Sequence, residues 1–492
     1  MLNKRNILII ILSFSLSQDT YTGYVIEEQD TLDIFSYQIP SNYLNENEHP
    51  LLVAFHQWGG NQNSPYNTQF DEEAEQRGWI FLSPFGGASN NYNHQGAQHY
   101  TEKAILWLSE NYSIDLNRIY MVGGSMGGAS GAIYANNHLD PTKPMVAATA
   151  SASGILDCER RAIEMDGNNS MTEWFGGNWD EVPFEYHRNS AVYFADSTQS
   201  MHYNLQYTPL YLDFGITEPH RTHAEDLYAL LQGYNQNMWI DTEPTGSHGY
   251  SVIDEYHACN WLSHYDLEDN PDNINVNLDE PSRAYWIEAY NQINDEDFIR
   301  IHASREYINI VMPNINYEGY GFSVNNTINS DSLIMHILDP QYTIDNNIFK
   351  AGISLESLES NMRIGFSGKL FNGNNLSNIT IYDFSSGTSA VCTNPDNPLS
   401  LNYTIEDGII WIGENHWLSG FECENFYFIE IEFYNDIDLD GIWTVSDIII
   451  LIDHIVNGQL LDDTQILNGD INQNQTLDIL DIVLIINIIL ES

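Results

Sequence analysis

Short apolar runs alternate with helical patterns between about Tyr24 and His264. Apolar residues recur at i, i+3 and i+4 within Ala104–Leu108 and within Leu227–Leu231, which indicates amphipathic helices. Strands that alternate with helices are typical of a mostly parallel sheet covered on both faces. The pattern therefore predicts the α/β fold class for this part of the chain. The strand-sized runs are Leu51 to Phe55, Trp79 to Leu82, Ile119 to Val122, Val146 to Ala150 and Leu210 to Leu212.

A different pattern follows Asn270–Asn273, a polar stretch with a proline and no periodicity that predicts a domain boundary. From about Arg283 to Phe433, short apolar runs are separated by Asn, Ser and Gly, which favours β-strands. We expect a β-sandwich region over residues 283–434, which would serve as a spacer or as a carbohydrate-binding module. The clearest runs are Tyr307 to Val311, Tyr320 to Val324, Ile364 to Phe366 and Ile429 to Phe433.

The end of the chain has a third pattern, an internal duplication. Two acidic loops within residues 435–492 are each followed by an Ile- and Leu-rich helical stretch. Paired units of this kind usually pack on each other, because neither buries its apolar face alone. We therefore expect a small α-helical module here.

The first residues have the pattern of an export signal. A basic stretch up to Arg5 precedes an apolar run from Ile7 to Leu12 and the small-x-small ending Ser15–Ser17. The run is shorter than the ~20 residues that span a bilayer, and no later uncharged apolar run reaches that length. We expect a signal peptide over residues 1–17, an α/β domain over 18–268, and a protein that is secreted or attached to the cell surface.

Composition narrows the choice of partners. With 16 basic and 69 acidic residues, the 492-residue chain has a formal net charge of -53, which repels phosphate backbones and anionic lipids. Nucleic acid is therefore not an expected partner. Four cysteines are too few for a disulfide scaffold. Pairing Cys158 with Cys259 and Cys392 with Cys423 is the simplest of three connectivities, among which the sequence does not decide.

A candidate nucleophile lies in Gly123–Gly127, which has the form G-x-S-x-G. The motif follows the predicted strand that ends at Val122 and precedes a helix rich in small residues, as a nucleophile elbow requires. The glycines permit a sharp turn that lifts the Ser125 hydroxyl out of the sheet. We expect Ser125 to be the nucleophile.

A serine hydroxyl needs a base and an acid that orients the base, in the chain order Ser, Asp or Glu, His. His248 lies between small residues in a predicted loop at the expected place, so it is the candidate base. Glu218, in the loop after the run at Leu210, is the candidate acid, and Asp213 and Asp226 are weaker candidates. His257 and His264 fall on the following helix and are interpreted as packing or solvent-facing residues.

The reaction also needs backbone NH groups directed at the oxyanion. Met126 is expected to supply one, because it follows the nucleophile. The loop His56–Gly60 resembles the H-G-x-x-G loop of esterases, with Gln57 in place of the first Gly. Either Gln57 or Trp58 would supply the second NH group. Trp58 is also a candidate wall for the acyl or aryl part of a substrate.

With these motifs, residues from about Tyr24 to His264 resemble α/β-hydrolase esterases related to polyhydroxybutyrate depolymerases and to feruloyl and acetylxylan esterases. The resemblance implies hydrolysis of carboxylic esters, in a polyester or a plant or algal polysaccharide, through an acyl-enzyme on Ser125 and without a catalytic cofactor. Residues Glu159 to Asn204, with three large aromatic side chains, are a candidate cap over the site or ordinary core.

Two alternatives stay open. A serine peptidase of the prolyl oligopeptidase type shares the elbow and the order of the triad. A non-catalytic binding or adhesion protein on a hydrolase fold is motivated by Gln57 and Glu218, which differ from the usual residues of the family.

The duplicated acidic loops have the spacing of calcium loops, with oxygen ligands at positions 1, 3, 5, 7 and 12. The second loop has Gln475 where Gly eases the turn, which predicts weaker binding. Because position 12 is Asp in both, the module resembles a dockerin, and that resemblance implies structural calcium and a cohesin-type protein partner. The candidate ligands are Asp436, Asp438, Asp440, Ile442 and Asp447 in the first loop and Asp470, Asn472, Asn474, Thr476 and Asp481 in the second.

Overall fold

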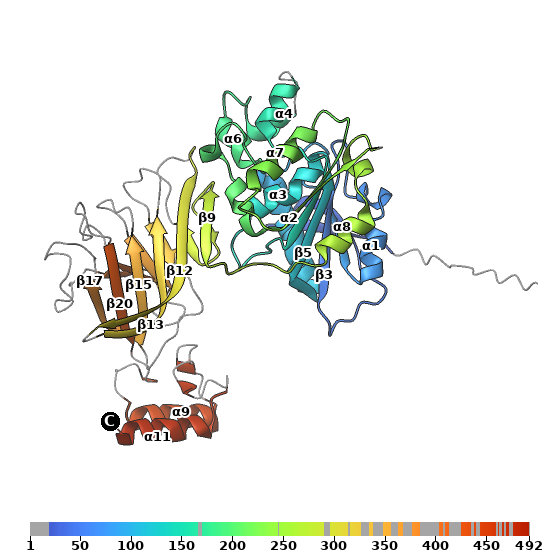
Figure 1. Ribbon diagram of the computed structural model, residues 1–492. Helices are drawn as coiled ribbons and strands as arrows, with labels where there is room; N and C mark the ends of the chain where they lie inside the picture. Colours follow the sequence, from blue (N-terminus) through green and yellow to red (C-terminus); the bar gives the residue numbers. More distant parts are fainter. Residues whose placement is uncertain are drawn as a thin grey trace, which may run out of the picture. The chain divides into compact units, whose positions relative to one another are not determined.

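The computed structural model describes residues 19–165, 170–244, 246–289 and 296–305, the backbone of the strands between 306 and 433, and parts of 437–491. The predicted signal peptide, residues 1–17, lies outside the described residues. The chain forms two compact units, and apart from the short segment Leu139–Pro141 the first ends at Glu268 and the second begins at Asp269 (Figure 1). Each unit is described by itself.

The first unit is built on one mixed sheet of eight strands in the order β1-β2-β4-β3-β5-β6-β7-β8. The strands from β4 to β8 run parallel to their neighbours, and the hairpin β1–β2 joins the edge antiparallel to β4. The predicted α/β class is therefore confirmed for this half of the chain. The strands are β1 (Tyr21–Glu27), β2 (Asp30–Gln38), β3 (His49–Phe55), β4 (Ile80–Pro84), β5 (Ile114–Gly124), β6 (Ala148–Ala152), β7 (Leu210–Gly215) and β8 (Met238–Glu243).

Both faces of the sheet are covered, which explains the continuous apolar runs. Every residue of β3, β4, β6 and β7 is buried. In β3, Leu51 and Val53 share a core with α2, α3 and α7, whereas Leu52 and Ala54 share one with α1 and α8, because successive side chains alternate between faces. The helices are α1 (Phe70–Arg77), α2 (Gln95–Asn111), α3 (Met126–Asn137), α7 (Arg221–Leu231) and α8 (Glu255–Leu262).

The segment between β6 and β7 forms a small layer of its own, with the short helices α4 (Cys158–Glu164), α5 (Met171–Phe175) and α6 (Pro183–Arg188) (Figure 1). Its buried side chains, among them Phe175, pack with Met126 at the start of α3, and Trp174 and Trp179 lie against this cluster. The candidate cap is therefore packed next to the residue that follows Ser125.

The expected pairing of Cys158 with Cys259 is wrong, because both thiols are free and buried. Cys158 begins α4 and belongs to the core of the inserted segment, whereas Cys259 on α8 belongs to the core on one face of the sheet. Burial raises the pKa of the Cys158 thiol to about 12, which keeps it protonated. Cys392 and Cys423 lie outside the described residues.

The second unit contains two six-stranded sheets, β10-β11-β14-β16-β19-β18 and β17-β20-β15-β13-β12-β9. The four predicted runs fall in β12, β13, β16 and β20, and β9 begins at Asn273, within the stretch predicted as the boundary. Face-to-face packing of the two sheets as a sandwich stays a prediction. The strands are β9 (Asn273–Leu278), β10 (Arg283–Ala284), β11 (Ile287–Ala289), β12 (Ile299–Met312), β13 (Ile315–Asn325), β14 (Ile334–Ile337), β15 (Ile348–Leu355), β16 (Arg363–Ser367), β17 (Leu376–Asp383), β18 (Tyr403–Glu406), β19 (Ile409–Ile412) and β20 (Asn425–Phe433).

Near the C-terminus, the helices α9 (Val445–Asn457) and α11 (Ile479–Glu491) correspond to the two Ile- and Leu-rich stretches. Leu451 of α9 and Ile485 of α11 are fully buried in one small core, as expected for paired units. Among the described residues, the search for a helix with the length and apolar character to cross a membrane found none.

Candidate active site

Ser125 lies on a strained turn between β5 and α3. Its backbone has φ 57° and ψ -121°, a conformation that a residue with a side chain adopts at a cost of about 1–3 kcal/mol. A Cβ on Gly123 would lie 2.0 Å from the Gly127 carbonyl oxygen, and a Cβ on Gly127 would lie 2.6 Å from the His56 carbonyl oxygen. Both motif glycines are therefore required by close backbone approach, and they hold the turn against the loop after β3.

The three predicted triad residues form one hydrogen-bonded chain. His248 Nε2 lies 2.7 Å from Ser125 Oγ, and His248 Nδ1 lies 2.6 Å from Glu218 Oε2. The residues come from loops after β5, β7 and β8, at the carboxyl ends of parallel strands where α/β sheets bind their ligands. The imidazole is 38% exposed and the carboxylate 1% exposed, so the candidate base is accessible while the candidate acid is buried.

Three donors hold the Glu218 carboxylate. Oε2 faces His248, and Oε1 accepts hydrogen bonds from Ser153 Oγ at 2.7 Å and from Gly215 N at 3.0 Å. Burial alone would raise the pKa of Glu218, but these hydrogen bonds outweigh it and lower the pKa below its usual value. Glu218 is thus ionised and fixed in place, as an acid that orients an imidazole must be.

Ser153 was not predicted from the sequence. It is a buried residue just after β6 with φ 53°, and its own NH donates to the Asp213 carbonyl oxygen at 2.8 Å. The sequence signal for a role of Ser153 is its position directly after a central parallel strand. Many residues have such a position, so the signal does not single out Ser153.

The weaker acid candidates lie elsewhere. Asp213, at the end of β7, has its carboxylate near Tyr211 OH at 3.5 Å, and Asp226 on α7 pairs with Arg160 at 2.8 Å. His257 on α8 contacts the Tyr211 hydroxyl, and His264 is exposed, in line with their interpretation as packing and solvent-facing residues.

The loop after β3 supplies candidate oxyanion donors. The Gln57 carbonyl oxygen is held by His56 Nδ1 at 2.8 Å and by Gly60 N at 2.9 Å. Because a peptide is planar and trans, the NH of Trp58 points away from those partners. In the described part of the chain, no group accepts a hydrogen bond from the backbone NH of Met126, Gln57 or Trp58.

Two side chains of this loop contact different neighbouring segments. Gln57 Oε1 accepts from Tyr250 N at 3.4 Å and so links the loop to the one that carries His248. Trp58 is 59% exposed, and its indole NH lies 3.3 Å from Ser170 Oγ next to α5. Its exposure favours the interpretation as a substrate wall over simple packing.

The candidate calcium residues are described only in part. Asp447 is fully buried, and its carboxylate accepts from Ile437 N at 2.8 Å and from Thr444 N at 2.8 Å. Asp481 is equally buried and accepts from Asp478 N at 2.9 Å, so both position-12 carboxylates face the residue three positions before them. Asp438, Asp470 and Thr476 are described, whereas Asp436, Asp440, Ile442, Asn472 and Asn474 lie outside the described residues.

Comparisons with known proteins give distant likenesses. No family model matches the chain. A bifunctional acetylxylan esterase/xylanase of Neocallimastix patriciarum is 29% identical over 141 residues, which are 27% of this chain and 20% of that protein, so the chain spans one fifth of the length of this curated relative.

Solved structures that resemble about half of the chain include serine hydrolases, esterases and an acylaminoacyl peptidase of Pyrococcus horikoshii. One of them is a fluorophosphonate-binding serine hydrolase of Staphylococcus aureus. It has a TM-score of 0.37 and 13% sequence identity, and the match covers 50% of this chain and 98% of that chain. An S-formylglutathione hydrolase of Agrobacterium tumefaciens has a TM-score of 0.39 and 11% identity, and the match covers 51% of this chain and 98% of that chain. A ferulic acid esterase has a TM-score of 0.37 and 15% identity, and the match covers 50% of this chain and 95% of that chain.

Proposed function

We propose that the first unit is a serine hydrolase that cleaves carboxylic esters through an acyl-enzyme on Ser125. The observation that carries the proposal is the continuous chain of hydrogen bonds from Ser125 Oγ through both nitrogens of His248 to Glu218, at 2.7 and 2.6 Å. A hydroxyl on a strained turn, a base in contact with it and a buried carboxylate behind the base are the three parts that acyl transfer needs.

In the first half-reaction, Oγ of Ser125 bonds to the ester carbonyl carbon as its proton passes to Nε2 of His248. The negative charge moves to the carbonyl oxygen, where the NH of Met126 and that of Gln57 or Trp58 would stabilise it. The bond to the leaving alcohol then breaks, and His248 returns the proton to that oxygen. Water repeats the sequence on the acyl-enzyme and releases the acid and Ser125.

The test is hydrolysis of p-nitrophenyl acetate together with covalent labelling by a fluorophosphonate. Ser125→Ala is expected to lose turnover by at least about 10⁵-fold and to lose the label, with an unchanged circular dichroism spectrum. The matched control is Ser263→Ala, at the exposed end of α8, which should keep both. Equal turnover by Ser125→Ala and the native chain would eliminate the proposed nucleophile.

We also propose that the C-terminal module binds structural calcium and a cohesin-type protein. Two fully buried carboxylates, each held by backbone NH groups at matching places of the two loops, fit the loop geometry that binds a hard cation. In the first loop, Asp438 and Asp447 would be among the calcium ligands. In the second loop, the corresponding residues are Asp470 and Asp481. Exposed apolar side chains on both helices, such as Val456 and Leu490, favour a protein partner.

For calcium, terbium luminescence on the full chain is expected to reveal binding that calcium displaces and that Asp447→Ala weakens. Binding that is the same in the variant and the native chain would contradict the assignment. Secretion or attachment to the cell surface stays a prediction from residues 1–17, and it fits an enzyme that acts on a polymeric ester.

A further inference from the structure

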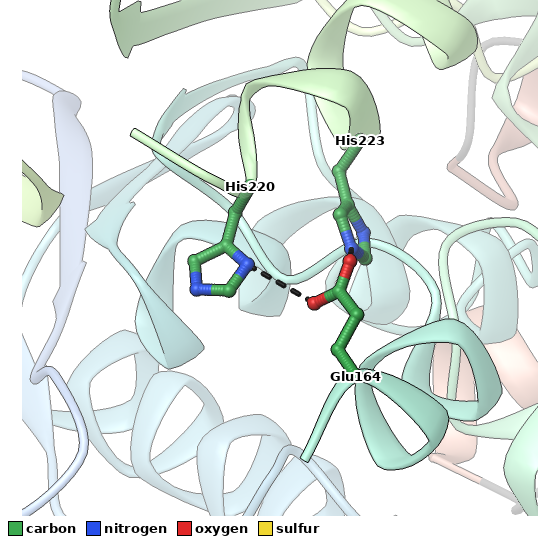
Figure 2. Close-up of side chains that lie close together, drawn as sticks. All are labelled: Glu164, His220 and His223. Carbon is green, nitrogen blue, oxygen red and sulfur yellow. Dashed lines mark hydrogen bonds and ion pairs between the residues drawn. The ribbon is translucent and has the colours of Figure 1, made fainter. Parts of the chain in front are cut away.

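Figure 2 shows that Glu164, His220 and His223 lie close together. Glu164 is the last residue of α4, and the two histidines lie at the start of α7, just after Glu218. His220 Nδ1 is 3.1 Å from Glu164 Oε2, and His223 Nε2 is 3.8 Å from Glu164 Oε1. One carboxylate and two imidazoles at this spacing would suit either a metal ion or a hydrogen-bonded network.

The backbone decides between these alternatives at His223. Its Nδ1 accepts hydrogen bonds from Leu156 N and Asp157 N, both at 3.2 Å, so this nitrogen carries no hydrogen. The ring hydrogen is therefore on Nε2, directed at Glu164. A metal ion would need a free electron pair on that same Nε2. At 3.8 Å this nitrogen makes no hydrogen bond to Glu164, and the one hydrogen bond within the cluster joins His220 to Glu164. Because His223 directs a hydrogen at Glu164, the cluster does not offer the electron pairs of a metal site.

The same logic fixes the hydrogen of His220. Burial alone would raise the pKa of Glu164, but its contact with His223 and the hydrogen bond from Arg161 lower the pKa, so Glu164 is a carboxylate near neutral pH. It accepts from Nδ1 of His220, and Nε2 is left with an electron pair. Among the described residues, the hydrogen bond of the His220 ring is the one from Nδ1 to Glu164, and the side chain is 11% exposed. His220 thus has an acceptor nitrogen with no partner in the described part of the chain.

His220 also has a defined place relative to the reaction. Its ring lies edge-to-face against the ring of His248, with centroids 5.5 Å apart and planes at 65°. In acyl transfer the base hands its proton to the leaving oxygen, so the leaving alcohol has to lie next to His248. A side chain packed against that imidazole is a neighbour of the leaving alcohol.

We propose that His220 is a specificity-determining residue that accepts a hydrogen bond from a second hydroxyl of the leaving alcohol, so that the preferred substrates are esters of polyhydroxy alcohols such as sugars. The proposal rests on the proposed ester hydrolysis. Burial and the charge of Arg161 lower the pKa of His220, which keeps the ring an acceptor near neutral pH. Glu164 serves as the positioning residue that holds Nδ1.

The test compares trans-2-hydroxycyclohexyl acetate with cyclohexyl acetate, two esters that differ by one hydroxyl group. The native chain is expected to prefer the hydroxylated ester in kcat/KM by about fivefold or more, the size of one neutral hydrogen bond. His220→Phe keeps a ring without an acceptor and should bring the ratio close to one. His220→Gln offers an amide oxygen and should restore part of the preference, and His264→Phe on exposed His264 is the matched control.

The outcomes distinguish the role of His220 from ester hydrolysis on Ser125. If Ser125→Ala abolishes cleavage of both esters but the native ratio is one, ester hydrolysis stands and the role of His220 is wrong. A His220→Phe variant that is slower on both esters by the same factor would also overturn that role, since it would only support His248. If Ser125→Ala still cleaves the esters, both proposals fall. If His220→Phe does not fold, the kcat/KM ratios of the two esters are compared between the native chain and His220→Gln. A ratio near one in the native chain would overturn the role of His220.

Discussion

Two carboxylate–imidazole pairs lie side by side in the first unit, Glu218 with His248 and Glu164 with His220. In both, the carboxylate binds Nδ1 and its pKa is lowered, although burial opposes this. They differ at the other nitrogen, because Nε2 of His248 reaches Ser125 Oγ and Nε2 of His220 reaches no group in the described part of the chain. A carboxylate–imidazole pair therefore becomes a base only where the fold brings a hydroxyl to it.

Ser125 differs from the two histidines in its backbone conformation. Neither histidine has a positive φ, whereas Ser125 does, and two glycines are needed to fit its turn between β5 and the loop after β3. The backbone strain therefore lies at the candidate nucleophile, whereas both imidazoles are on unstrained backbone.

The largest expected effect separates the two imidazoles. His248→Ala should lower kcat on p-nitrophenyl acetate by at least about 10⁴-fold, because no other group takes the proton from Ser125. His220→Ala should lower it by less than about tenfold. Steady-state kinetics on both variants provide the measurement, and similar losses would erase the distinction between the pairs.

The two carboxylates should differ next. Glu218→Gln removes the charge that holds the imidazolium and should cost about 10²–10⁴-fold in kcat. Glu164→Gln should change kcat on the same ester by only a few-fold, because its partner does not touch Ser125. A larger loss in Glu164→Gln than in Glu218→Gln would reverse the assignment of the acid.

The two pairs also differ in that a serine hydroxyl, Ser153 Oγ, donates a hydrogen bond to the Glu218 carboxylate. Ser153→Ala removes the donor at 2.7 Å from Oε1, which should raise the pKa of Glu218 and lower kcat about tenfold with little change in KM. The pH profile of kcat should shift with it, which a purely structural defect would not cause. Unchanged kcat and an unchanged profile would show that two donors suffice.

Asp213 is a buried carboxylate without an imidazole. Burial, and then the charge of Asp241, raise its pKa to about 7, so its contribution to stability is complete below its unfolded pKa near 3.8 and is lost as pH rises through 7. Asp213→Asn should therefore unfold like the native chain at pH 4 and be more stable at pH 8, by roughly a few kcal/mol at most. Melting curves of the full chain at both pH values test this, and an equal difference at the two values would contradict the shift.

The sequence predicted the α/β class and three residues, Ser125, Glu218 and His248, which the structure joins in one chain of hydrogen bonds. Continuous apolar runs such as Leu51 to Phe55 are local signals of buried parallel strands, and G-x-S-x-G carries its strand-turn-helix setting with it. The chain order Ser, Glu, His then directed attention to the loops after β7 and β8. Each of these signals is local or follows from the order of elements in one sheet.

The tertiary structure alone decided which polar groups support the site. Ser153 is 65 residues from Glu218, and Glu164 is 56 residues from His220, so no spacing in the sequence links them. The free thiols of Cys158 and Cys259 likewise depend on which cores their helices join. Apolar periodicity records which residues are buried, but the partner of a buried polar group is set by the packing of distant segments, because a hydrogen bond needs a few tenths of an ångström in three dimensions and leaves no period along the chain.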